Sequence, residues 1–97
     1  MILGFRDRAT EDLFNGVDSK ASRTIHRVVW PVAARKLDLL NAAHDLRDLG
    51  AAPGNRLERL KGAWRGCYSI RVNDQYRVVF QWADGNAHDV LITDYHS

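Results

Sequence analysis

Cysteine and long apolar runs are the two features that this 97-residue sequence has least of. A single cysteine, Cys67, excludes an intramolecular disulfide and a cysteine-rich zinc site. No apolar stretch approaches the roughly 20 residues that a membrane-spanning helix needs. The opening residues lack a basic segment followed by an apolar one, so we expect no secretory signal. These absences predict a reduced, cytoplasmic protein, and the length predicts one domain over residues 1–97.

A large excess of charge of one sign is also missing. Fourteen lysines and arginines face twelve acidic residues, and a net charge of +2 does not by itself indicate nucleic-acid binding. The distribution is uneven, however, because residues 56–77 hold six basic residues and only two acidic ones. Such a stretch is typical either of a solvated surface or of a site for anions. The four histidines are scattered without the spacing of metal ligands, so we predict no metal and no cofactor.

The first half of the chain has the apolar spacing of helices. Thr10, followed by two acidic residues, is typical of the N-cap of a short helix that ends at Gly16. Apolar residues recur at three- or four-residue intervals or their multiples from Pro31 to Leu49, which predicts one amphipathic helix. The apolar segment from Met1 to Phe5 predicts an edge strand.

The second half alternates with a period of two. This pattern predicts strands over residues 67–72, 76–82 and 89–95, with a shorter strand over residues 57–60. Because strands that follow one another through tight turns form an antiparallel meander, the helices must cover one face of that sheet. The other face is then partly open. We therefore expect an α+β fold.

The register of the first hairpin can be argued from the alternation. A loop of Asn73, Asp74 and Gln75 places apolar residues opposite one another, namely Val72 with Tyr76, Ile70 with Val78 and Tyr68 with Phe80. The same register places Arg71 opposite Arg77 on the exposed face, where like charges repel by up to about 1 kcal/mol. Either an anion lies between the two guanidinium groups, or both side chains splay into water.

The second hairpin has two possible registers. A two-residue turn at Gly85-Asn86 pairs Arg77 with Asp94, whereas a loop one residue longer pairs Tyr76 with Asp94. In both registers the closing Asp94-Tyr95-His96 lies beside the start of the strand that carries Arg77. A carboxylate, a phenol and an imidazole are groups that move protons, and the neighbouring basic residues are groups that hold phosphate.

Several segments together resemble HigB toxins of the RelE superfamily. These segments are residues 53–58, Leu60-Lys61-Gly62, residues 68–82 and the closing Asp94-Tyr95-His96. Residues 2–14 and Ala34-Arg35-Lys36-Leu37 fit the same family, so the resemblance covers nearly the whole chain. It implies a RelE-like fold, a small antiparallel β-sheet with N-terminal helices packed on one face.

The resemblance also implies an activity and its partners. It implies the toxin of a type II toxin–antitoxin system, a ribosome-dependent and metal-free endoribonuclease that cleaves translated mRNA. The implied partners are a HigA-like helix-turn-helix antitoxin, the 70S ribosome and mRNA, with DNA reached only through the antitoxin and no membrane. Two alternatives remain open, a non-enzymatic toxin of the same superfold that inhibits gyrase and an RNA-binding module that docks on the ribosome without cleavage.

The family's catalytic residues map onto five positions of this sequence, Asp94, Tyr95, His96, Lys61 and Arg77. We predict four further contacts to RNA or phosphate, namely Arg59, Arg71, Asn73 and Gln75. Glu58 stands where some members of the family carry a catalytic histidine; a carboxylate can serve as a base, but it adds negative charge beside a phosphate. We expect the antitoxin to bind along the helical side and the first strand, away from these residues.

Overall fold

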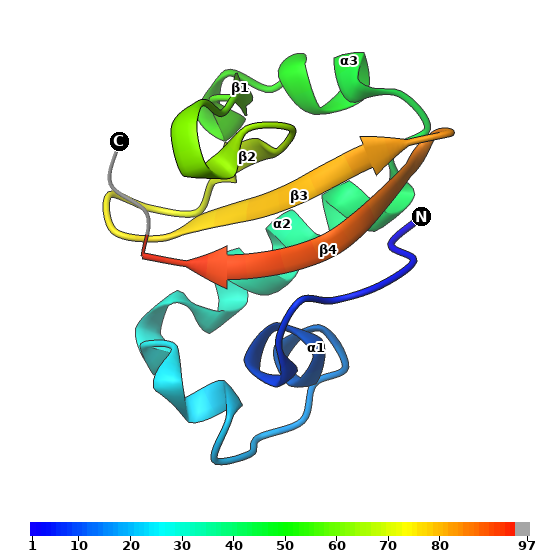
Figure 1. Ribbon diagram of the computed structural model, residues 1–97. Coiled ribbons are helices and arrows are strands. Elements are labelled where there is room, and N and C mark those ends of the chain that lie inside the picture. Colours follow the sequence, from blue (N-terminus) through cyan, green and yellow to red (C-terminus); the bar gives the residue numbers. More distant parts are fainter. Residues whose placement is uncertain (95–97) are drawn as a thin grey trace.

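A four-stranded antiparallel sheet organises the structure, a computed structural model that describes residues 1–94 (Figure 1). The strands lie side by side in the order in which they occur in the sequence, which confirms the predicted meander. Their bounds are Glu58–Arg59 for β1, Tyr68–Arg71 for β2, Arg77–Ala83 for β3 and Asn86–Thr93 for β4.

The first hairpin has the predicted register. Tyr68 lies opposite Phe80, Ile70 opposite Val78 and Arg71 opposite Arg77. The connecting loop is closed by the Asn73 side chain, whose amide oxygen accepts hydrogen bonds from the backbone N–H groups of Gln75 and Tyr76 at 2.9 and 2.7 Å. The apolar alternation and a local Asx turn therefore act together to set this pairing.

The hairpin of β3 and β4 does not have the predicted register that pairs Arg77 with Asp94. Its turn consists of Asp84 and Gly85, both with positive φ, so the turn begins one residue earlier than Gly85-Asn86. A β-bulge then shifts the pairing between Val79 and Gln81, and Asp89 on the opposite strand has a φ of 51°. As a result Thr93, and not Asp94, lies opposite Arg77.

The N-terminal segment lies along the edge of the sheet next to β4, but it forms isolated bridges and not the predicted edge strand. Two parallel bridges, Ile2 to Ala87 and Phe5 to Val90, attach it. Four backbone hydrogen bonds of 2.8–3.0 Å run between this segment and β4. The segment therefore covers the open edge of β4, where unpaired N–H and C=O groups would otherwise face solvent.

The first helix, α1 (Arg8–Phe14), begins one turn earlier than predicted. The side chain of Asp7 accepts a hydrogen bond from the Thr10 N–H at 2.9 Å, so Asp7 and not Thr10 is the N-cap. Thr10 is fully buried instead, and its hydroxyl oxygen accepts a hydrogen bond from the backbone N–H of Ile92 in β4 at 2.9 Å. This bond joins the helix to the sheet across 82 residues of sequence.

The predicted helix over residues 31–49 is two helices. α2 spans Trp30–Ala42 with a proline in its first turn, and α3 spans Leu46–Gly50. The chain is extended at Ala43, and α3 starts with a capping box. The Asp45 side chain accepts a hydrogen bond from a backbone N–H in the first turn of α3, and the Asp48 side chain accepts one from the backbone N–H of Asp45. The apolar spacing continues through the break because both helices pack on the same core.

The main core lies between α2 and the inner face of the sheet. In Figure 1, α2 passes behind β3 and β4, and its buried Ala33, Leu37 and Leu40 belong to the same apolar cluster as Ile70, Val78 and Phe80. A second, smaller cluster of Leu60, Cys67 and Val79 lies on the outer face, where Trp64 packs against it. The short 3-10 turns at Ser22–Thr24, Arg27–Val29, Pro53–Asn55 and Gly62–Trp64 complete the chain.

Replacing Thr10 with valine is expected to lower the free energy of unfolding by about 1–3 kcal/mol, because it leaves the buried N–H of Ile92 without an acceptor. Thr10→Ser is the matched control, since it keeps the hydroxyl oxygen and loses only a methyl group. Urea denaturation followed by circular dichroism measures both variants. An equal loss in the two variants would mean that packing, and not the hydrogen bond, makes Thr10 important.

Candidate active site

The outer face of the sheet carries two arginines directly opposite each other, as predicted. Arg71 and Arg77 are paired across β2 and β3, and each has its own carboxylate. Arg71 forms an ion pair with Asp74 of the hairpin loop, and Nη2 of Arg77 lies 3.6 Å from Oε1 of Glu58 in β1. These carboxylates offset the repulsion between the two cations, so neither a bound anion nor full solvation is needed to explain the pair.

Arg77 is the more firmly held of the two. Its side chain is only 15% exposed, and Nη2 donates a hydrogen bond of 2.9 Å to the backbone carbonyl oxygen of Arg56. Arg56 has a left-handed backbone with a φ of 45°, a conformation that costs a non-glycine residue of order 1 kcal/mol. The turn that leads into β1 therefore helps to orient the guanidinium group of Arg77.

Two buried polar atoms at this position have no hydrogen-bond partner within residues 1–94. They are Nε of Arg77 and Oγ of Ser69. Ser69 lies opposite Glu58 in β1 and opposite Val79 in β3. It therefore shares the outer face with Arg77, which is the next outer-face residue before Val79 in β3. Buried polar groups without a partner are uncommon in folded proteins and indicate a functional position.

Sequence reasoning did not select Ser69. The alternation had placed it on the exposed face between Cys67 and Arg71, where a serine is an ordinary surface residue. It is fully buried because the chain after β1 folds back over the outer face and packs Leu60 and Trp64 there. A small hydroxyl residue between a cysteine and an arginine was the available signal, and it was too weak to use.

Asp94 reaches the same end of the sheet. Nε2 of Gln75 donates a hydrogen bond of 3.2 Å to Oδ2 of Asp94, and Thr93 is the residue opposite Arg77. This matches the second predicted register, in which Asp94 lies beside the start of β3. Tyr95 and His96 lie outside the described residues.

The remaining predicted contacts are distributed unevenly. Glu58 is part of the cluster, and Lys61 is exposed just after β1, where the chain turns over the outer face. Arg59 pairs with Tyr68, an inner-face residue, so it lies on the opposite face from Glu58 and Arg77. The amide oxygen of Asn73 is already used in the hairpin loop, which leaves its amide N–H₂ as the available donor.

The candidate site combines cations with carboxylates at its margin. Arg77 and Arg71 provide positive charge on the outer face, each beside a carboxylate, and Lys61 is exposed just after β1. Glu58 and Asp94 lie at the edge of this cluster. Within residues 1–94, no group of three or more His, Cys, Asp or Glu side chains is placed to hold a metal ion, and no helix is long and apolar enough to span a membrane.

Comparisons with known proteins assign this arrangement to a family. A family model described as the RelE-like toxin HigB of type II toxin–antitoxin systems matches residues 3–96. Toxin HigB-1 of Vibrio cholerae serotype O1 is 45% identical over 87 residues, which are 90% of either chain. Two solved YoeB–YefM complexes from Staphylococcus aureus contain a chain with the same fold, with a TM-score of 0.59, identities of 14% and 15%, and coverage of 100% of this chain and 99% of theirs. The chain therefore belongs to the HigB-like toxins, a family of RelE-like toxins of type II toxin–antitoxin systems.

Proposed function

We propose that this toxin is a ribosome-dependent endoribonuclease that cleaves translated mRNA without a metal ion and is neutralised by a HigA-like helix-turn-helix antitoxin. The observation that carries the proposal is the state of Arg77, whose guanidinium group is oriented by Glu58 and Arg56 but keeps a buried Nε without a partner in the described chain. Because Nε is buried, a phosphate oxygen would reach the guanidinium group at the exposed part of the side chain. The family supports the same assignment, since both the matched model and the Vibrio relative are toxins of the HigB kind.

The proposed reaction is attack of an RNA 2′-hydroxyl on the adjacent phosphate. The oxygen–phosphorus bond to the next nucleotide breaks, which leaves a 2′,3′-cyclic phosphate and a 5′-hydroxyl end. His96 or Asp94 takes the proton of the 2′-hydroxyl, and a proton is returned to the leaving 5′ oxygen. General acid–base catalysis of this kind contributes about 100- to 10,000-fold.

The cations act on the negative charge that the phosphate gains in the transition state. Arg77 is held in place before RNA binds, so little reorganisation is needed, and removing one such group typically costs about 3 kcal/mol. Lys61 and Arg71 add to this charge, and Tyr95 orients the nucleotide. Glu58 keeps Arg77 in position and is a second candidate for proton transfer.

The ribosome supplies what so small a protein lacks. A principal-axis extent of 32 Å leaves little surface on which to align a long RNA. An mRNA held in the decoding site already has fixed geometry, and such alignment is worth several kcal/mol in an intramolecular reaction. Dependence on the ribosome separates the proposal from gyrase inhibition, and cleavage of the mRNA separates it from ribosome binding without cleavage.

The direct test is to add the purified protein to translating ribosomes and map new 5′ ends of the mRNA. New 5′-hydroxyl ends within codons, formed only when the mRNA is being translated, support the proposal. A block of translation without new ends would favour a binding module. Inhibition of DNA supercoiling by gyrase, with no effect on translation, would favour the gyrase inhibitor.

Arg77→Ala is expected to reduce cleavage in this assay by about 100-fold or more, because it removes the preorganised cation. Arg65→Ala is the matched control, since Arg65 is an exposed arginine of the same basic stretch, and its cleavage should stay within about twofold. Equal losses in the two variants would assign the effect to general attraction between the basic stretch and RNA.

Ser69 is fully buried and lies diagonally across from Arg77, so it can act on RNA only through that side chain; Ser69→Ala is therefore expected to lower cleavage by about 10-fold, less than Arg77→Ala, without destabilising the fold. The free energy of unfolding should be unchanged or raised by up to about 1 kcal/mol, since the variant deletes a buried hydroxyl that has no partner in the described chain. Ser22→Ala is the contrast, because the equally buried Ser22 hydroxyl donates to the Val17 carbonyl oxygen at 2.9 Å. That variant should lose about 1–3 kcal/mol. A destabilised Ser69→Ala protein with full activity would make Ser69 a structural residue.

His96→Gln is expected to abolish cleavage and leave the thermal midpoint unchanged, because glutamine keeps a polar side chain but cannot exchange a proton near neutral pH. A His96→Gln variant that retains the wild-type rate would move the proton transfer to Asp94 or Glu58.

A further inference from the structure

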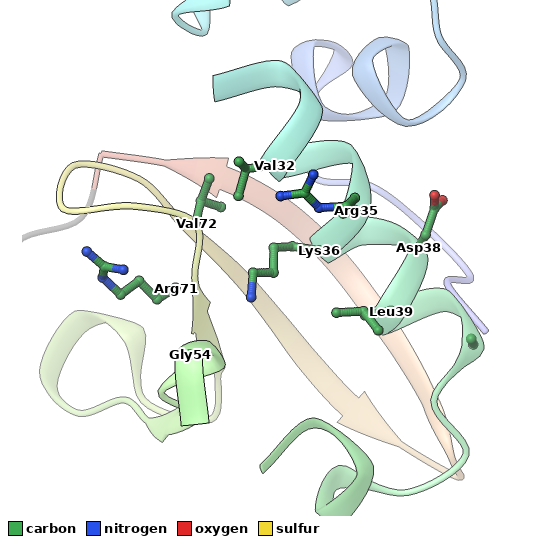
Figure 2. Close-up of a pocket in the computed structure, with 9 residues that line it drawn as sticks. Val32, Arg35, Lys36, Asp38, Leu39, Gly54, Arg71 and Val72 are labelled. Carbon is green, nitrogen blue, oxygen red and sulfur yellow. The ribbon is translucent and has the colours of Figure 1, made fainter. Parts of the chain in front are cut away.

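A hollow lies between α2 and the end of β2, next to the candidate active site at Arg71. It has a volume of about 490 Å³ and is lined by six residues of α2 and by Gly54, Arg71 and Val72; the α2 residues are Val32, Arg35, Lys36, Asp38, Leu39 and Ala42 (Figure 2). This hollow, the α2 groove, is within the range of sites that hold a ligand or part of a partner. None of the functions assigned to the outer face uses it.

The floor of the α2 groove is apolar. Leu39 is 48% exposed, and Figure 2 shows its side chain directed into the hollow from α2. Val32, Ala42 and Val72 line the same space. A half-exposed leucine on an otherwise amphipathic helix marks apolar surface that the chain itself does not cover.

The rim of the groove is positive. Arg35 and Lys36 line it from α2, and Arg71 lines it from β2, whereas Asp38, the acidic residue among those that line it, points away from the hollow in Figure 2. Arg71 is paired with Asp74, but within residues 1–94 no carboxylate forms an ion pair with Arg35 or Lys36. The groove therefore has two positive charges without a counterion from the described chain.

Lys36 is a partly buried cation beside two other cations. Partial burial, followed by the charges of Arg35 and Arg71, lowers the pKa of the Lys36 ammonium group below its ordinary value. Its hydrogen bond goes to the neutral side-chain oxygen of the buried Asn55, which does not offset the charge. A carboxylate brought into the groove would offset the repulsion from Arg35 and Arg71 and favour the charged form of Lys36.

We propose that the α2 groove binds a segment of the antitoxin that inserts an apolar side chain onto Leu39 and places carboxylates against Arg35 and Lys36. This inference rests on the proposed function, because it takes its partner from the toxin–antitoxin assignment. An apolar anchor surrounded by charges is the usual composition of a protein interface, in which the anchor supplies affinity and the charges supply orientation. The surface lies on the helical side, where the antitoxin was expected from the sequence.

The chemistry of the groove favours a protein segment over RNA. Single-stranded RNA binds through cations combined with aromatic side chains on which bases stack. The residues that line the α2 groove include no aromatic side chain, and its centre is aliphatic. The outer face differs, because there the cations surround buried polar atoms.

The test compares the affinity of the helix-turn-helix antitoxin for variants of the full-length toxin, measured by calorimetry. Leu39→Asp and Arg35→Glu should each weaken binding by about 100-fold or more, since each puts a negative charge where the partner's apolar anchor or carboxylate lies. Val28→Asp and Lys20→Glu make the same changes at exposed positions outside the groove and should stay within about threefold. The thermal midpoint of each variant checks that it is folded.

Hydrogen–deuterium exchange of the wild-type complex gives an independent readout. Antitoxin should slow exchange in α2 and around residues 53–55, and Arg77→Ala should bind it within about tenfold of wild type. If Leu39→Asp and Arg35→Glu bind the antitoxin with full affinity, and slowed exchange is confined to β1 and the loop after it, the antitoxin does not bind the α2 groove. The proposed function would not be affected by that result. If the antitoxin forms no complex with wild-type toxin, both the proposed partner and its proposed binding surface in the α2 groove are wrong. A Leu39-dependent dimer of the toxin that excludes the antitoxin would assign the groove to a second copy of the chain.

Discussion

The pairing of β2 with β3 is the constraint on which the rest of the structure depends. Two apolar pairs on the inner face, Tyr68 with Phe80 and Ile70 with Val78, hold it, and a slip by one residue would turn these side chains toward solvent. Because side chains alternate between faces, the same register places Ser69, Arg71 and Arg77 on the outer face. The core and the candidate active site are therefore two consequences of one pairing, and a mutation that weakens the register would damage both.

The outer face becomes a site only because the chain between β1 and β2 returns over it. Leu60 and Trp64 cover Cys67 and Val79, which removes water from the neighbourhood of Ser69 and Arg77. In such a region a charge interacts more strongly with a phosphate than it does in water. The left-handed Arg56 directs its carbonyl oxygen at Arg77, so backbone strain in the preceding turn and the orientation of the cation are linked.

The two charged surfaces of the protein meet at Arg71. The candidate active site lies on the outer face of β1, β2 and β3, and the α2 groove lies between α2 and the end of β2 (Figure 2). Arg71 takes part in both, since it lies opposite Arg77 and also lines the groove. A partner in the α2 groove would therefore lie beside Arg71 at the end of β2.

The sequence by itself determined the meander, the register of the first hairpin and the facing arginines, because each follows from a period-two pattern and a short loop. The resemblance to HigB toxins, carried by the residues themselves, was confirmed for the family and the fold. Only the tertiary structure decided the remaining features. The apolar spacing continued through the break between α2 and α3, and the bulge at Asp89 changed a register that turn length alone suggested. Thr10 binds a backbone group that is distant in sequence, and Ser69 is buried by a segment that folds over it from another part of the chain. Local sequence patterns do not predict such contacts.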